Sequence, residues 1–180
     1  TYQIHCVICI SFLSHYFFGV EAEEKREVFV KVVYDDKSVG EEVRMQKVAR
    51  EETAGKCRIP EIYHYDMKLE RSVIVMERIR NRRVPSRAVV VYATSLLGSV
   101  KALHDCGILH CDIKPSNVLW DGSSVAIVDF GHAQMIESAR SYVGTRGFTA
   151  PEVVADEAPH STASDAFSIG KTLERVAEDG

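Results

Sequence analysis

The chain has 180 residues, of which 46% are hydrophobic and 27% are charged. This balance is typical of a globular domain and too apolar for a disordered chain. The formal net charge of −4 at pH 7 argues against nucleic acid as the main partner, because binding a phosphate backbone needs clustered Lys and Arg. The five cysteines are odd in number and scattered, so the sequence favours a reducing, intracellular compartment over a disulfide framework.

The N-terminal part of the chain is rich in β-branched and aromatic residues. Residues 4–20 form an apolar run that lacks the basic start of a signal peptide and is short for a membrane span, so we expect buried strands and no membrane partner. Residues 27–35 alternate and residues 71–79 are mostly apolar, and both predict strands. Residues 39–52 place apolar side chains at helical spacing among charges, which predicts an amphipathic helix.

The chain changes character after a polar, proline-containing segment at residues 80–87, which predicts a linker. Residues 88–104 suit a buried helix, and Gly107 is its expected stop signal. Two short apolar runs at residues 117–120 and 125–130 predict a hairpin.

Residues 164–179 predict a final helix with Ser164 as its N-cap. The sequence therefore predicts one α+β domain over residues 1–180, with a small β-rich lobe and a mainly helical lobe. We place these lobes at residues 1–79 and 84–180, with a hinge at residues 77–83.

Two polar motifs carry groups suited to phosphoryl transfer. HCDIKPSN occupies residues 110–117 and DFG occupies residues 129–131. Phosphoryl transfer needs a carboxylate that orients the attacking hydroxyl and accepts its proton, an Asp and an Asn that hold magnesium, and a Lys that offsets charge on the transferred group. Magnesium prefers hard oxygen ligands, which Asp129 and Asn117 supply.

These motifs resemble those of eukaryotic-type protein kinases. HCDIKPSN is similar to the kinase catalytic loop, and DFG matches the metal-binding motif. The segment GTRGFTAPE at residues 144–152 resembles the end of a serine/threonine kinase activation segment, and Asp165 resembles the aspartate that anchors the catalytic loop. The resemblance covers residues 20–180 and implies a bilobal kinase fold, ATP and Mg2+ as cofactors, and a protein substrate.

The resemblance assigns roles to residues of the C-terminal part. Asp112 is the expected catalytic base and Lys114 the expected γ-phosphate contact. Asn117 and Asp129 are the expected magnesium ligands, and Asn117 also belongs to the catalytic set. The remaining assignments are the activation segment, with Asp129, Phe130, Gly131, Thr145, Ala150, Pro151 and Glu152, and a structural anchor of His110 and Asp165.

The N-terminal part supplies the expected phosphate contact. The motif VFVK, which ends at Lys31, resembles the strand whose lysine binds the α- and β-phosphates. The partner of this lysine is expected on the following helix, at Glu41 or Glu42. We prefer Glu41, because it shares a helical face with Met45 and Val48.

The other nucleotide contacts are expected at the roof of the cleft and at the hinge. VMERI resembles the hinge, with Met76 at the gatekeeper position and the backbone of residues 77–79 facing adenine. The full expected set of nucleotide-binding residues is Val20, Phe29, Lys31, Glu41, Met76, Glu77, Ile79 and Leu119.

The sequence departs from the kinase pattern in four ways. No glycine-rich loop precedes Lys31; only Gly19 lies near, with Val20 in the place of the valine that covers adenine. Phe29 replaces the usual alanine and shares a strand face with Lys31, so its ring crowds the expected ATP site. Cys111 replaces the arginine that pairs with a phosphate on the activation loop. The chain also ends before several helices that the family normally has.

Three functions remain open at this point. The motif set favours an ATP- and Mg-dependent serine/threonine protein kinase. Phe29 and the missing glycine-rich loop favour a pseudokinase or decayed fragment that acts as a binding scaffold. A small-molecule phosphotransferase has a similar catalytic loop, but DFG followed by an APE motif argues against it. The sequence determines neither the protein substrate nor the oligomeric state.

Overall fold

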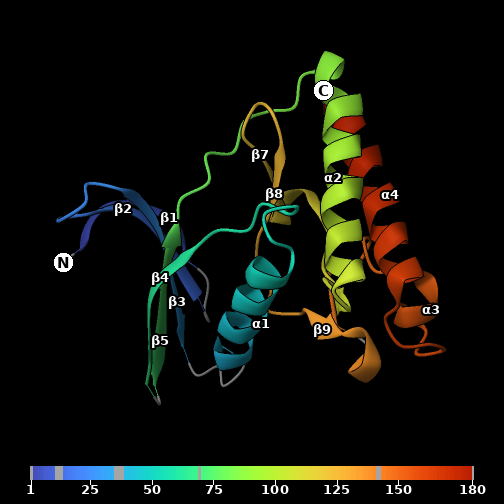
Figure 1. Cartoon of the computed structure of the whole chain (residues 1–180), viewed down its shortest axis with the longest axis horizontal. Coiled ribbons are helices and arrows are strands. Elements are labelled where there is room, and N and C mark those ends of the chain that lie inside the picture. Colours follow the sequence, from blue (N-terminus) through green and yellow to red (C-terminus); the bar gives the residue numbers. More distant parts are fainter. Residues whose placement is uncertain (1, 11–13, 35–38, 69, 141–142, 180) are drawn as a thin grey trace.

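A five-stranded sheet and a set of helices form the two sides of the molecule (Figure 1). This computed structural model describes residues 2–10, 14–34, 39–68, 70–140 and 143–179, with the backbone alone for residues 5–10. The α+β architecture agrees with the prediction from sequence. The helical side holds two long helices within the described residues.

The sheet comes entirely from the first half of the chain. Its strand order is β1-β2-β3-β5-β4, and every neighbouring pair is antiparallel. Its members are β1 (Tyr2–Ile10), β2 (Ser14–Glu21), β3 (Glu27–Tyr34), β4 (Ile62–Met67) and β5 (Arg71–Glu77). The strands predicted at residues 27–35 and 71–79 are confirmed, although β5 ends at Glu77, where the chain enters the linker.

Helix α1 (Val39–Glu52) connects the sheet to the rest of the molecule and has the predicted bounds. Val39 and Val43 pack against the inner faces of β3 and β5. Met45 and Ala49, further along the helix, belong to the larger core that also contains side chains of the helical side. The helix is therefore held from two directions, which fixes its acidic residues relative to both halves.

The second half of the chain is mainly helical. Helices α2 (Val89–Asp105) and α4 (Thr162–Asp179) lie side by side (Figure 1). Leu96 and Leu103 of α2 are fully buried in the larger core, and such burial contributes about 1.5–3 kcal/mol per side chain. Among the described residues, no helix is both long and apolar enough to cross a membrane. The short elements are η1 (Ser86–Ala88), β6 (Ile108–Leu109), η2 (Pro115–Asn117), β7 (Val118–Trp120), β8 (Val125–Ile127), β9 (Gln134–Met135), η3 (Ile136–Ser138) and α3 (Pro151–Val154).

Helix ends follow local signals, with one correction. Gly107 ends α2 as predicted: its φ is +75°, and its N–H donates to the carbonyl oxygen of His104 at 2.9 Å. Ser164 was predicted to cap α4, but it lies inside the helix and is buried. The N–H of Ser164 donates to Oγ of Ser161 at 3.3 Å, and the N–H of Ser161 donates to Oγ of Ser164 at 2.9 Å. This reciprocal pair resembles a capping box, so the start signal lies three residues earlier than predicted.

The linker between β5 and α2 is irregular, as predicted, and it is anchored. The backbone N–H of Arg82 donates to the carbonyl oxygen of Trp120 at 2.7 Å. In return, the N–H of Trp120 donates to Oδ1 of Asn81 at 2.9 Å. The linker is therefore fastened to the β7–β8 hairpin, where it borders the space between the two sides of the molecule.

Candidate active site

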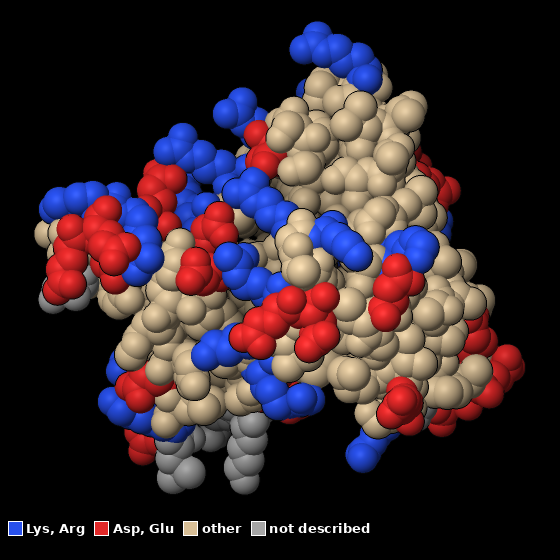
Figure 2. Space-filling model, viewed as in Figure 1, with Lys and Arg blue, Asp and Glu red and all other residues tan. Residues whose placement is uncertain are grey.

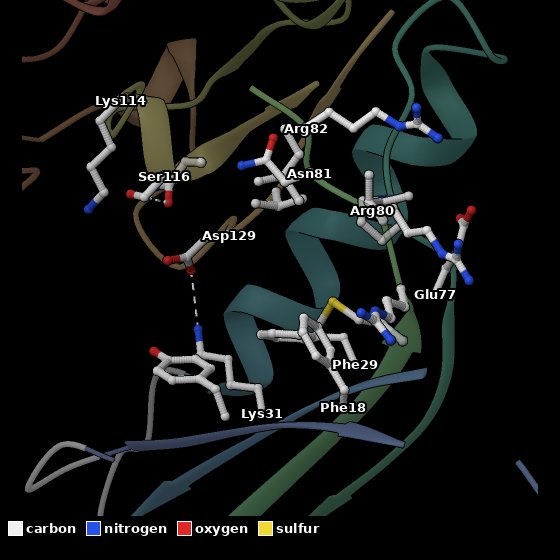
Figure 3. Close-up of a pocket in the computed structure, with 18 of the residues that line it drawn as sticks. Phe18, Phe29, Lys31, Glu77, Arg80, Asn81, Arg82, Lys114, Ser116 and Asp129 are labelled. Carbon is white, nitrogen blue, oxygen red and sulfur yellow. Dashed lines mark hydrogen bonds and ion pairs between the residues drawn. The ribbon is translucent and has the colours of Figure 1, made fainter. Parts of the chain in front are cut away.

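A cavity of about 880 Å3 lies between the sheet and the helical side. Its walls come from β2, β3, α1, β5, the linker and the loops around residues 114–119 and 128–129. Figure 3 shows Lys31, Asp129 and Lys114 toward one side of this cavity, and Phe29 and Glu77 toward the other. The volume is within the range of about 300–1,000 Å3 that is usual for small-molecule sites.

Lys31 links β3 to α1 and to the loop after β8. Its Nζ donates to the two carboxylate oxygens of Glu42 at 2.8 and 2.9 Å, and to Oδ1 of Asp129 at 3.2 Å. The preference for Glu41 was therefore wrong: Glu41 lies on the exposed face of α1 and pairs with Arg44. Glu42 is 4% exposed, so the helix turns this carboxylate, and not its neighbour, into the cavity.

The charges of this group support one another. Burial alone would lower the pKa of Lys31, but the attraction of Glu42 and Asp129 outweighs burial and raises it. Burial would raise the pKa of the Asp129 carboxyl, but the charge of Lys31 outweighs it and lowers the pKa. Lys31 is therefore a cation and Asp129 an anion at neutral pH.

Asp112 lies at the centre of a second group of polar contacts. Nζ of Lys114 donates to Oδ2 of Asp112 at 2.7 Å and to the Thr145 hydroxyl at 2.7 Å. The Thr145 hydroxyl donates to Oδ1 of Asp112 at 2.7 Å. Nδ2 of Asn117 donates to the carbonyl oxygen and to Oδ2 of Asp112, at 2.9 and 3.1 Å. The structure thus brings together the three predicted catalytic residues and Thr145, which the sequence placed in the activation segment.

These donors set the charge of Asp112. Burial would raise the pKa of its carboxyl, but contacts from His132, Lys114 and Thr145 outweigh burial and lower it. Nδ1 of His132 lies 3.7 Å from Oδ2 of Asp112, and this contact raises the pKa of the imidazole more than burial lowers it. Asp112 is therefore ionised over the physiological range, as a proton acceptor must be.

Asp165 of α4 holds the loop that carries Asp112. Its two carboxylate oxygens accept from the N–H groups of His110 and Cys111, both at 3.0 Å. Cys111 has a φ of +64°, in the left-handed region that is costly for a residue with a Cβ. His104 of α2 contacts the same carboxylate through Nε2 at 2.9 Å. Asp165 thus stabilises a strained backbone in the loop that carries Asp112.

His110 ties this loop to the segment that carries Asp129. Its Nε2 lies 3.1 Å from the carbonyl oxygen of Val128, and its ring packs edge-on against Phe130 at 5.2 Å. Phe130 is 1% exposed in the larger core. The loop that carries Asp112 and the segment that carries Asp129 are therefore positioned by a shared buried contact.

Aromatic rings form the roof of the cavity. Phe29 pairs with Phe18 across β2 and β3, with ring centroids 6.0 Å apart, and lies 5.8 Å from the ring of Tyr16. All three rings line the cavity, whereas Val20 does not. The placement of Val20 over the nucleotide was therefore wrong, because the strand register puts Phe18 opposite Phe29. The other expected contacts line the cavity: Met76, Glu77, Ile79 and Leu119.

The packing of β2 against β1 explains why position 19 is a glycine, without any contact to a nucleotide. A Cβ on Gly19 would lie 2.5 Å from the carbonyl oxygen of Gln3 on β1. The glycine therefore permits close approach of two strands.

The donor set fits magnesium and a triphosphate. Asp129 is 40% exposed at its side chain, so it keeps open carboxylate surface beside its contact with Lys31. Asn117 uses Nδ2 for Asp112. Among the described residues, its Oδ1 then has one long contact, at 3.3 Å from the Ser116 hydroxyl. One carboxylate and one amide oxygen match the few hard protein ligands that magnesium takes when phosphates complete its shell. The described residues contain no group of three or more His, Cys, Asp or Glu that could hold a metal by itself.

The segment after Asp129 returns to the helical side. Thr145 reaches Asp112, and the carbonyl oxygen of Phe148 accepts from the hydroxyl of Ser168 on α4 at 2.8 Å. Ala150 is fully buried just before α3, which begins at Pro151. Glu152 follows in α3 and has no ion pair within the part of the chain that the structure describes.

Comparison with known families decides what this arrangement belongs to. A family model described as the protein kinase domain matches residues 14–178. The chain belongs to the protein kinase family. This protein kinase is 38% identical over 96 residues, 51% of the chain, to mitogen-activated protein kinase kinase kinase 1a of Physcomitrium patens. It is also 35% identical over 95 residues, 50% of the chain, to the serine/threonine-protein kinase AfsK of Streptomyces griseus.

A third relative is the serine/threonine-protein kinase ppk21 of Schizosaccharomyces pombe, which is 32% identical to this kinase over 105 residues, or 51% of the chain. The matched regions are 13%, 12% and 19% of the lengths of the three relatives. The chain thus corresponds to a small part of each of these proteins.

Sequence reasoning missed several residues of this kinase's cavity. Tyr16 and Phe18 could have been found from alternation, because they share a strand face that ends opposite Phe29. His132 directly follows the DFG motif, but no local pattern indicates its contact with Asp112. The linker residues Arg80 and Arg82 lie in the segment that the sequence marked only as polar, and the anchored linker places them at the cavity wall.

Proposed function

We propose that this chain is an ATP- and magnesium-dependent serine/threonine protein kinase that transfers the γ-phosphate to a protein hydroxyl. The observation that carries the proposal is the position of the Asp112 carboxylate. It is held by Lys114, Thr145 and Asn117, and Lys114 and Asn117 line the same cavity as Lys31 and Asp129. A proton acceptor, two cations and two magnesium ligands then serve one site.

The roles follow from charge and position. Asp112 accepts a hydrogen bond from the substrate hydroxyl and then its proton, since its lowered pKa keeps it a carboxylate. Lys114 offsets negative charge on the group in transfer. Lys31 orients the phosphates and is itself oriented by Glu42. ATP would supply the phosphoryl group. Asn117 and Asp129 would hold magnesium, which would offset negative charge on the phosphates.

The fold supplies the two sides of the cleft. We propose residues 77–83 as the hinge, with lobes at residues 1–79 and 84–180. Glu77 and Ile79 line the cavity beside the aromatic roof, which suits contact of the hinge backbone with a purine base. The gatekeeper position falls to Met76, which is 5% exposed and lines the same wall.

A second candidate function rests on one observation. The ring of Phe29 occupies the cavity roof and packs with Tyr16 and Phe18. Added volume of this kind costs about 1–3 kcal/mol in a well-filled site. Because the ring occupies space that ATP would need, it favours a pseudokinase, a protein that binds a partner without transferring phosphate.

Binding and transfer measured separately distinguish the two functions. Calorimetry of the full chain with ATP, in magnesium and then in a chelator, should give magnesium-dependent binding that Asp129→Asn weakens. Asp105→Asn is the matched control, because Asp105 is an exposed residue at the end of α2 that pairs with Lys101. Transfer of labelled γ-phosphate to a serine peptide should then follow. Binding without transfer would favour the pseudokinase, and absence of both would refute the kinase proposal.

A further inference from the structure

The linker between β5 and α2 presents three arginines to two cavities. Arg78, Arg80 and Arg82, which we call the arginine rim, line the candidate nucleotide cavity and also a neighbouring cavity of about 520 Å3. Figure 2 shows basic side chains, with acidic ones between them, gathered along the region where this linker runs. The rim thus forms the boundary between the proposed active site and an open surface hollow.

Positive charge exceeds negative charge in the neighbouring cavity. Four arginines and two carboxylates line it: Arg58, Arg78, Arg80, Arg82, Glu27 and Asp121. Arg80 binds Glu27 through two hydrogen bonds of 2.8 and 3.0 Å. Asp121 accepts from the N–H groups of Ser123 and Ser124 at 2.8 and 2.9 Å and pairs with Arg58. Both carboxylates are therefore already engaged, and they leave cationic groups without a full counter-charge.

Arg82 is the least engaged member of the rim. Within the described part of the chain, its guanidinium has neither a hydrogen bond nor an ion pair, although its backbone is fixed to Trp120 at 2.7 Å. Its side chain lies along Gly122, whose φ is +111° and where an added Cβ would come within 3.4 Å of Arg82 Cδ. The anchored backbone keeps Arg82 at the border of the two cavities, and its guanidinium is available to pair with an anion.

Arg78 adds a second incompletely satisfied group. Its guanidinium stacks on the ring of Phe18 at 3.7 Å from the centroid. Its Nε is buried and has no hydrogen-bond partner among the described residues, although one terminal nitrogen lies 3.5 Å from Glu27. Buried donors without partners are unusual in folded proteins. The stacked ring fixes the guanidinium plane at the cavity wall.

We propose that the arginine rim binds an anionic side chain, a carboxylate or a phosphate, of the protein substrate. The inference rests on the proposed kinase function and adds a substrate class to it. Guanidinium groups match the planar, two-oxygen geometry of carboxylate and phosphate. Lys114 and Ser116 line the same cavity as Arg80 and Arg82. The rim also lines the neighbouring open cavity, so an anionic side chain can approach the arginines from outside the space proposed for the nucleotide.

The test uses the full chain and fluorescent serine peptides. One peptide is neutral, a second series carries one Glu at successive positions on either side of the serine, and a third carries phosphoserine at the best of these positions. Binding is measured by anisotropy, and transfer by kcat/KM. We expect one Glu position to improve binding and kcat/KM by about tenfold over the neutral peptide, with a further gain for phosphoserine. This advantage should shrink at high salt.

Variants assign the effect to the rim. Arg82→Ala should remove most of the acidic advantage, and Arg82→Glu should replace it with a preference for a Lys peptide. Arg87→Ala is the matched control, because Arg87 lies in the same linker region but lines neither cavity. An equal gain from Glu and phosphoserine would indicate carboxylate recognition, and a gain from phosphoserine alone would indicate a site for already phosphorylated substrates.

The two hypotheses fail in different ways. Transfer to peptides without any acidic preference, or with a preference that survives Arg82→Glu, overturns the arginine rim and leaves the kinase function standing. Acidic binding that depends on Arg82 without transfer to any peptide supports the rim and refutes the kinase function. The binding measurement therefore tests the arginine rim, and the transfer measurement tests the kinase function.

Discussion

Lys31 on β3 and Glu42 on α1 form an ion pair of 2.8 Å at the wall of the cavity. Both side chains are largely withdrawn from water, with exposed fractions of 12% and 5%. The pair fixes α1 against the sheet and turns the lysine toward Asp129. The position along the helix decides which glutamate pairs with Lys31, since Glu41, one residue earlier, faces solvent.

The first prediction compares the two neighbouring glutamates. Glu42→Gln should lower kcat/KM by at least about tenfold, because the lysine–glutamate pair must be in place for phosphoryl transfer. Glu41→Gln should change it little, since exposed ion pairs such as that with Arg44 contribute about 0–1 kcal/mol. Steady-state kinetics on both variants, with circular dichroism to check folding, tests this. Equal losses in the two variants would contradict the assigned pair.

The second prediction concerns the proton acceptor. Asp112→Asn should reduce transfer by at least about 100-fold, because the amide cannot accept the substrate proton. ATP affinity should change less than transfer, because Lys31 and Asp129 contact each other and do not depend on Asp112, although Lys114 and Asn117 do contact it. Rapid-quench kinetics and calorimetry provide the two numbers. Transfer at the wild-type rate in Asp112→Asn would show that another group acts as the base.

The third prediction concerns Phe29. Phe29→Ala removes a ring from the cavity roof, and we expect ATP binding to tighten by about tenfold, which corresponds to relief of about 1–3 kcal/mol of overpacking. Val32→Ala is the control, because Val32 lies on the same strand but outside the cavity lining. Calorimetry with ATP and magnesium measures both. Weaker binding by Phe29→Ala would mean that the ring stacks on the base and would remove the main argument for a pseudokinase.

The fourth prediction concerns pH and His132. Contact with Asp112 raises the pKa of the His132 imidazole above its ordinary value of about 6.5. A group whose pKa is raised on folding contributes its full stabilisation at pH values below its pKa in the unfolded state. This contribution is lost as the pH rises through the pKa of the folded state. NMR titration of the imidazole should show a midpoint above about 6.5 that falls in Asp112→Asn.

Stability measurements give an independent check on His132. His132→Gln should destabilise the protein more at about pH 5.5 than at about pH 9, because only the protonated ring attracts the carboxylate. The difference will be modest, since the His132 side chain is 44% exposed. A larger effect at the higher pH would contradict the sign.

The sequence predicted those parts of the structure whose signals are local. The alternation in β3 and the helical spacing in α1 identified both elements to within a residue at each end. The order of the polar motifs identified Asp112, Lys114, Asn117 and the Asp129 segment as one group. In each case, residues close in sequence were enough to identify the element or the motif.

The errors arose where the answer depends on contacts across the fold. Glu41 and Glu42 are 100° apart on a helix, and the apolar residues used to choose between them fit either face. Glu42 shares a helix face with Val39, three residues before it, and Ala49, seven residues after it. Both are buried, so this face was the better indication of which glutamate points inward. Val20 was placed by its neighbour Gly19, but the pairing of β2 with β3 sets the register and puts Phe18 in the roof.

The hydrogen bonds between Asp165 and the loop at residues 110–111 have a consequence for synthesis on the ribosome. The carboxylate accepts from His110, which precedes it by 55 positions in the chain. At about 5–20 residues per second, the loop waits roughly 3–11 s before the residue that fixes it has even been made. Until then the N–H groups of His110 and Cys111 lack the carboxylate that accepts from them in the folded protein. The loop therefore gains this contact only after α4 has been made and has docked against α2.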